Sequence, residues 1–170
     1  MKSTQIRTLT LEEERTWSNA IGGVFLNFGG IEFASYRWIE ALSQDPMLRD
    51  VAIDMNLGRR IDLIKKLILR SNWDGEKQKA AIDLWKTVAG HSKIRNTIAH
   101  NPMTFGRNRD GDAVGGIINV KEMKGPGPYD VPTLSVMELV ETARRVARIA
   151  DKLQSLWANE EPKKDQSSTG

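Results

Sequence analysis

A long run of apolar residues at helical spacing is the feature that most restricts how this chain can fold. Between residues 10 and 42, large apolar side chains recur every three or four positions, from Trp17 to Leu42. That period is typical of an α-helix and not of a β-strand. Thr10 and Glu13 form a capping-box pattern, which predicts that the helix begins there. A helix with so long an apolar stripe has to be covered by other elements of the fold.

Two glycine pairs interrupt this first helix. Gly22-Gly23 and Gly29-Gly30 lie seven residues apart, and therefore on nearly the same face. Each glycine costs a helix interior about 1 kcal/mol relative to alanine. We expect another backbone or a ligand to come close to the helix there, and tight packing of a neighbouring helix is the simpler of the two explanations.

Further helical patterns follow along the chain. Asp45 before Pro46 predicts the start of a second helix, which meets Gly58 and can bend or restart there. A third begins after a turn at residues 71–75, and a capping box at Ser135 and Glu138 opens the last. A basic run lies within the second pattern, and we expect it to be a solvated face, with nucleic-acid binding as the alternative; it comprises Arg59, Arg60, Lys65 and Lys66.

The chain changes its period after Pro102. Residues 103–107 and 116–123, separated by a polar turn, predict a β-hairpin. The fold class expected from these patterns is all-α: an antiparallel bundle of four to five helices with a small β-hairpin inserted before the last helix. We expect a flexible leader at residues 1–9, a single helical domain at 10–158 and a disordered tail at 159–170.

Composition narrows the range of functions. The chain of 170 residues has no cysteine, which excludes disulfides, thiolate zinc sites and a cysteine nucleophile and fits a reducing cytoplasm. The most apolar stretch, residues 20–31, is shorter than the roughly 20 residues of a membrane span, so we expect a cytoplasmic protein without a membrane partner. The net charge of +3 and the pI of about 9.2 are compatible with a nucleic-acid partner. Two histidines and scattered acids predict neither a metal nor a cofactor.

Polar residues with catalytic potential gather at the end of the third helical pattern. Arg95, Asn96 and His100 precede Asn101-Pro102, and the residue before a proline is disfavoured in a helix. Asn96 and His100 are four residues apart and therefore share a side of the helix. Past Gly90 the inward positions change from large apolar residues to small or polar ones, where a pocket would open. A permanent cation beside a titratable ring suits the cleavage of a phosphodiester.

The pattern Arg-Asn-x-x-x-His near the end of a bundle's third helix resembles the HEPN superfamily (higher eukaryotes and prokaryotes nucleotide-binding). Its signature is Arg, four to six residues and then His, with a polar residue often following the Arg. Arg95, Asn96 and His100 match the four-residue form, and the helical layout also fits. The toxin subgroup paired with a nucleotidyltransferase continues to a nearby Tyr, whereas this chain has Asn101-Pro102. The resemblance implies a metal-independent ribonuclease of toxin or antiviral defence systems, or an inactive binding or dimerisation module.

The chemistry can also be argued from the side chains. A neutral imidazole at His100 can take a proton from the ribose 2′-hydroxyl, and its protonated form can return one to the leaving oxygen. Arg95 would stabilise the phosphate, and Asn96 would orient His100 or the phosphate. The alternative is that Arg95 and His100 merely complement the helix dipole. We expect His91 to be structural.

Partners follow from the same reasoning. We expect RNA as the substrate and a homodimer, because two proton transfers are best served by two histidines and one chain offers one such set. An antitoxin or sensor protein is a further possible partner. Arg107 and Arg109, at the tip of the predicted hairpin, are candidates for contacting RNA phosphates. A non-catalytic RNA-, nucleotide- or protein-binding module and a purely structural helical adaptor remain the alternatives.

Overall fold

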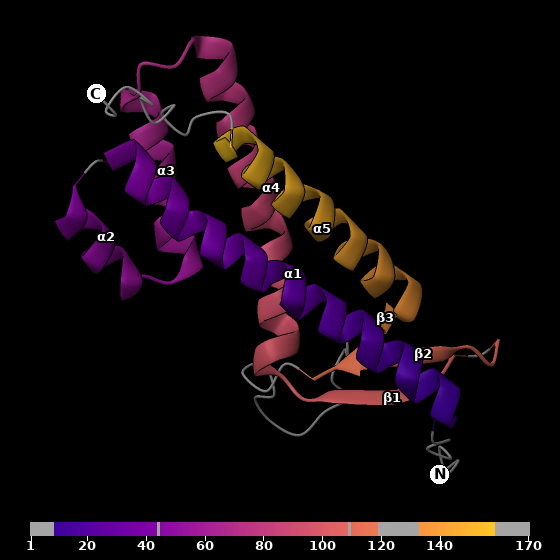
Figure 1. Ribbon diagram of the computed structural model, residues 1–170. Coiled ribbons are helices and arrows are strands. Elements are labelled where there is room, and N and C mark those ends of the chain that lie inside the picture. The colour runs from indigo at the N-terminus through magenta and orange to yellow at the C-terminus, as the bar shows by residue number, and fades with distance from the viewer. Residues whose placement is uncertain (1–8, 44, 109, 119–132, 159–170) are drawn as a thin grey trace, which may run out of the picture.

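A computed structural model describes residues 9–43, 45–108, 110–118 and 133–158, and shows a helical bundle with a small sheet at one end (Figure 1). The described helices are α1 (Leu11–Ser43), α2 (Pro46–Ile53), α3 (Leu57–Arg70), α4 (Gly75–His100) and α5 (Val136–Ala158). The sheet precedes the last helix, so the predicted all-α class with an inserted hairpin is confirmed. The predicted leader, apart from Leu9, and the predicted tail lie outside the described residues.

The helices begin where their capping residues predict. Glu13 donates its backbone N–H to the Thr10 hydroxyl at 3.2 Å and accepts the Thr10 N–H at 2.8 Å. The same reciprocal pair joins Ser135 and Glu138 before α5. Asp45 caps α2 through its side chain. The Thr10 backbone N–H, together with Arg107, holds the pKa of Glu13 below its ordinary value. Each capping pair satisfies amide groups that a helix start leaves without partners.

The central element is α1, which packs against all four other helices. Along the contact between α1 and α5, residue numbers increase in the same direction on both helices. Asn27 donates to the carbonyl of Ala143 at 3.0 Å, and Trp38 Nε1 donates to that of Leu153 at 3.2 Å. The two helices therefore run parallel, unlike the antiparallel neighbours expected throughout the bundle. The chain can make this arrangement because α4 ends, and the sheet lies, at the end of the bundle where α1 starts (Figure 1).

Only part of the glycine-rich face of α1 is closely packed. A Cβ atom added at Gly23 would lie 3.4 Å from the Cβ of Ala143 in α5. Positions 22, 29 and 30 have nothing within 4 Å of such an atom among the described residues. The close approach predicted for the glycine pairs is thus present at Gly23 and absent at the other three positions. At these three positions a Cβ atom would therefore fit without displacing a described neighbour.

The sheet is antiparallel, in the order β1 (Met103–Arg107), β2 (Ala113–Ile117) and β3 (Thr133–Ser135). The first strand has the predicted bounds. The second begins at residue 113 and not at 116, because a short turn in which Gly111 has φ of 90° reverses the chain. The predicted end of the hairpin, residues 119–123, lies outside the described residues. The third strand was not predicted, since three residues are too few to show a period of two.

Trp17 fixes the sheet against α1. Its ring is 5.1 Å from that of Phe105 in an edge-on arrangement. A Cβ atom at Gly115, the partner of Phe105 in the strand register, would lie 2.9 Å from Trp17 Cη2. Because Trp17 is buried and its ring is rigid, only glycine at position 115 leaves it room.

We therefore expect Gly115→Ala to lower the free energy of unfolding by roughly 1–3 kcal/mol, the usual cost of overpacking. Gly106→Ala is the matched control, because a Cβ atom there meets nothing within 4 Å. Urea denaturation followed by circular dichroism measures both. Equal effects of the two substitutions would show that Trp17 does not hold the sheet in this way.

Candidate functional site

The candidate site is a cavity of about 530 Å³ between α1, the α2–α3 connection, the first turn of α3 and the C-terminal half of α4. Its walls include all three residues of the predicted motif, Arg95, Asn96 and His100. An acidic, an amide and a basic side chain from the other elements complete them: Glu32 from α1, Asn56 from the connection and Arg60 from α3. The structure therefore brings Arg95, Asn96 and His100 into one hollow. Of the small or polar positions past Gly90 that the helical spacing predicts to face inward, Ser92 also lines the cavity, whereas Ala99 is exposed and lies outside the lining.

His100 is the last residue of α4, as predicted from the proline that follows. Asn101 ends the helix in an extended conformation, and its side chain donates to the carbonyl of Thr97 at 2.9 Å. The His100 ring is exposed and makes no hydrogen bond within the part of the chain that the structure describes. The imidazole is therefore accessible to a ligand, which suits a group that exchanges protons.

Arg95 is held on two sides. Its Nη2 donates to Glu32 Oε1 at 2.9 Å, and its Nη1 donates to Asn96 Oδ1 at 2.9 Å. Asn96 thus orients Arg95 here, whereas the sequence suggested that it would orient His100 or a phosphate. The Nε atom of Arg95 is buried and has no hydrogen-bond partner among the described residues. A buried donor without a partner costs about 1–3 kcal/mol, and an arriving acceptor that reached it would remove that cost.

Arg60 anchors the other oxygen of Glu32. Its Nη2 donates to Glu32 Oε2 at 2.8 Å, and its Nε donates to the hydroxyl of Ser35 at 2.8 Å. Its Nη1 donates to the hydroxyl of Tyr36 and to the carbonyl of Met55, each at 2.6 Å. Arg60 is 2% exposed, so its assignment to a solvated face was wrong. The reason is that α3 turns this position toward α1, where a carboxylate and three further oxygens replace water.

The balance of charge in the cavity favours an anion. Two guanidinium groups and one carboxylate leave one net positive charge, before any contribution from His100. Glu32 accepts a hydrogen bond from one nitrogen of each guanidinium. Arg95 has further N–H donors that form no hydrogen bond to Glu32 or Asn96. A phosphate could therefore be held by charge and by directed hydrogen bonds in the same place.

Arg107, one of the two predicted RNA-contacting arginines, is not part of this lining. Arg107 donates from Nη2 to both carboxylate oxygens of Glu13 at 2.8 Å, and from Nη1 to the carbonyl of Gly111 at 2.7 Å. These contacts tie the hairpin to the start of α1. Arg109 lies outside the described residues. A role of Arg107 and Arg109 in binding RNA therefore stays a prediction.

Sequence reasoning did not select Glu32 or Arg60. A signal for Arg60 was present, since it stands four residues before Ile64 and eight before Ile68, both of which are buried. Glu32 follows buried Ile31 in the apolar stripe of α1 and could have been noted as a carboxylate beside the core. Their mutual contact joins positions 28 residues apart and depends on tertiary packing.

No group of three potential metal-ligating side chains is found in the described residues. None of the described helices is long and apolar enough to cross a membrane. No family model matches the chain. Searches of curated proteins and of solved structures returned no significant match.

Glu32→Gln should destabilise the protein, because it leaves Arg60 charged and buried without a carboxylate. Breaking a buried pair costs 3–5 kcal/mol, and since the Glu32 side chain is 29% exposed we expect about 2 kcal/mol. Glu40→Gln is the matched control. Glu40 also lies in α1 and also bridges two arginines, Arg37 and Arg49, but on the surface.

The control should change the free energy of unfolding by less than about 0.5 kcal/mol. Urea denaturation at neutral pH measures both variants. If Glu32→Gln is no more destabilising than Glu40→Gln, the buried bridge does not support the fold.

Proposed function

We propose that this protein is a metal-independent endoribonuclease of the HEPN type that cleaves single-stranded RNA by attack of the ribose 2′-hydroxyl. The observation that carries the proposal is the placement of Arg95, Asn96 and His100 around one cavity with a net positive charge. The toxin or antiviral defence role implied by the family resemblance is part of this proposal. So are a cytoplasmic location and an antitoxin or sensor partner.

In the proposed reaction, the neutral ring of His100 removes the proton of the 2′-hydroxyl. The 2′-oxygen attacks the neighbouring phosphorus, and the bond from phosphorus to the 5′-oxygen breaks. A protonated imidazole then supplies the proton that the leaving 5′-oxygen needs. The products are a 2′,3′-cyclic phosphate and a 5′-hydroxyl end.

The guanidinium of Arg95 stabilises the charge that grows on the phosphate oxygens in the transition state. Glu32 and Asn96 hold the guanidinium in place before substrate arrives, so little reorganisation is needed. Arg60 makes this possible, since its buried charge keeps Glu32 directed toward the cavity. In this scheme Glu32, Asn96 and Arg60 are positioning residues.

One observation favours the alternative, a non-catalytic HEPN-like module for RNA, nucleotide or protein binding. The carboxylate of Glu32 competes with any phosphate for the guanidinium of Arg95. A site that only binds would retain affinity when His100 is replaced, whereas a catalytic site would lose product formation. The two functions are therefore separated by measuring binding and cleavage on the same variants.

The second histidine of the proposed chemistry would come from a second copy of the chain. The open positions Gly22 and Gly29 flank Leu26, which is 79% exposed. Gly29 lies three residues before Glu32 and hence beside it on the helix surface. Pairing of this face of α1 with its copy would bring the two cavities toward each other across a twofold axis.

The protein should cut single-stranded RNA in the presence of EDTA and leave DNA intact, because DNA lacks the 2′-hydroxyl. His100→Ala and Arg95→Ala should each reduce cutting roughly a hundredfold or more. His91→Ala is the matched control, since it replaces the other histidine of α4 and lies outside the cavity lining. Gel analysis of labelled RNA, with identification of the product ends, measures all of these.

Thermal unfolding of each variant should confirm that the fold is kept, because the His100 side chain is exposed. Cutting that requires magnesium, or that persists in both His100→Ala and Arg95→Ala, would falsify the mechanism.

Light scattering at micromolar concentration should show a dimer. Leu26→Arg should shift it to monomer, because a charged side chain cannot be buried between the glycines without a partner. Leu69→Arg is the matched control, since Leu69 is 63% exposed on α3, away from this face. A wild-type protein that stays monomeric even with RNA would contradict the shared-site scheme.

A further inference from the structure

A row of lysines runs along the exposed side of α4 and leads to His100. Lys79, Lys86 and Lys93 are seven residues apart, and His100 follows at the same interval. Seven residues are almost two turns of an α-helix, so residues at this interval share one side of it, with a drift of about 20° per interval. All four residues are exposed. Because α4 ends beside the sheet, this lysine row extends from the opposite end of the bundle to the candidate site (Figure 1).

Little negative charge opposes the lysine row. No aspartate or glutamate occurs between residues 84 and 109. Lys86 forms an ion pair with Asp83 at 3.0 Å, in which both side chains are more than half exposed. Neither Lys79 nor Lys93 forms an ion pair within the part of the chain that the structure describes. The charges of the row are therefore available to an anion from outside the chain.

Gly90 lies on the same side of α4, four residues after Lys86 and three before Lys93. Glycine weakens a helix interior relative to alanine. Packing gives no reason for it here, because Gly90 is exposed and a Cβ atom added to it meets nothing within 4 Å among the described residues. The missing side chain leaves room for a ligand to lie against the helix backbone between two cations.

The dimensions of the row fit a chain of phosphates. At 1.5 Å per residue, successive lysines are about 10 Å apart, and Lys79 is roughly 32 Å from His100 along the helix axis. Phosphates in a stacked strand are about 3.4 Å apart, so roughly nine nucleotides span the row. A small anion would reach one lysine, whereas a polyanion reaches all of them. α4 has no exposed large apolar side chain, and so lacks the anchors with which a helix binds a membrane surface.

We propose that the lysine row is the track along which single-stranded RNA lies when its scissile phosphate is in the candidate site. On one side of the scissile bond, successive phosphates contact Lys93, Lys86 and Lys79, and the strand passes over Gly90. Lysines contact phosphates as point charges, so the track binds RNA without reading its sequence. The inference rests on the proposed function for the identity of the ligand.

Binding can be tested without cleavage on the whole chain. The probe is a fluorescent 2′-O-methyl oligouridylate of 12 nucleotides, which has no free 2′-hydroxyl and is not cut. Lys79→Gln and Lys93→Gln should each weaken binding about fivefold at 0.1 M salt and flatten the plot of log K against log salt by about 0.7, the value for one phosphate contact on a single strand. Lys152→Gln is the matched control, an exposed lysine of α5 that should change neither. Fluorescence anisotropy measures all of these.

The length of the oligonucleotide measures the length of the track. Affinity should rise with length up to about nine nucleotides and then level off. Lys79→Gln shortens the row by one interval, so its affinity should level off at about six nucleotides, whereas Lys152→Gln should leave the limit unchanged. Gly90→Leu should also weaken binding, although it replaces glycine by a better helix former and should not lower the thermal stability.

Equal effects of Lys79→Gln and Lys152→Gln, or an unchanged salt slope in Lys93→Gln, would overturn the proposal. Equal affinity for polyaspartate or for phosphatidylserine vesicles would also overturn it, because another anion would then be the occupant. If the wild-type protein cuts RNA while the lysine variants bind normally, the track is wrong and the proposed function stands. If the variants bind more weakly but no RNA is cut, the track stands and the proposed catalysis is wrong.

Discussion

The two carboxylate oxygens of Glu32 form ion pairs with the guanidinium groups of Arg60 and Arg95, and the candidate site is built around this bridge. Arg60 is buried on one side, where only the carboxylate and nearby oxygens compensate its charge. Arg95 lies on the other side, at the cavity. A single side chain of α1 thus joins the start of α3 to the last turns of α4. Stability and the geometry of the site consequently rest on the same atoms.

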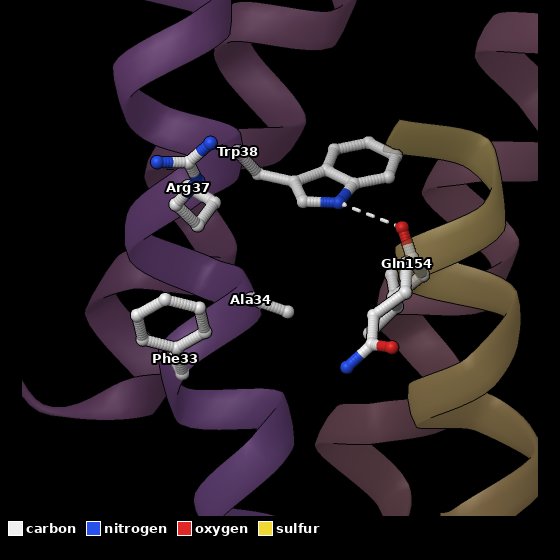
Figure 2. A pocket seen from close by; sticks show the side chains of 6 residues that line it. Phe33, Ala34, Arg37, Trp38 and Gln154 are labelled. Carbon is white, nitrogen blue, oxygen red and sulfur yellow. Dashed lines mark hydrogen bonds between the residues drawn. The ribbon is translucent and has the colours of Figure 1, made fainter. Parts of the chain in front are cut away.

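Residues 32–38 of α1 contact different parts of the molecule on two faces of the helix. Glu32, Ser35 and Tyr36 face Arg60. The positions between and after them, Ala34 and Trp38, line a hollow between α1 and α5 (Figure 2). Helical spacing produces this division, because residues three and four apart share a face and the residues between them turn away.

Much of the fold could be predicted because local rules determine where helices begin and end. The capping residues at Thr10, Asp45 and Ser135, and the proline after α4, each act within one turn of chain. The joint placement of Asn96 and His100 likewise follows from their spacing. The burial of Arg60 could not be predicted from a charge pattern, because it depends on a carboxylate 28 residues away. The direction of α5 was missed for the same reason, since helix pairing is a tertiary property.

The parallel pairing of α1 with α5 has a consequence for how the chain is made. The contacts that join these helices span 115 and 116 residues. Ribosomes deliver the N-terminal helix first, so the side of α1 that meets α5 stays uncovered until nearly the whole domain has emerged. Docking of α5 on α1 is therefore a late event, because it closes a chain segment of more than a hundred residues. During synthesis the part of α1 that includes Gly23 and Asn27 therefore stays in contact with water until α5 has been made.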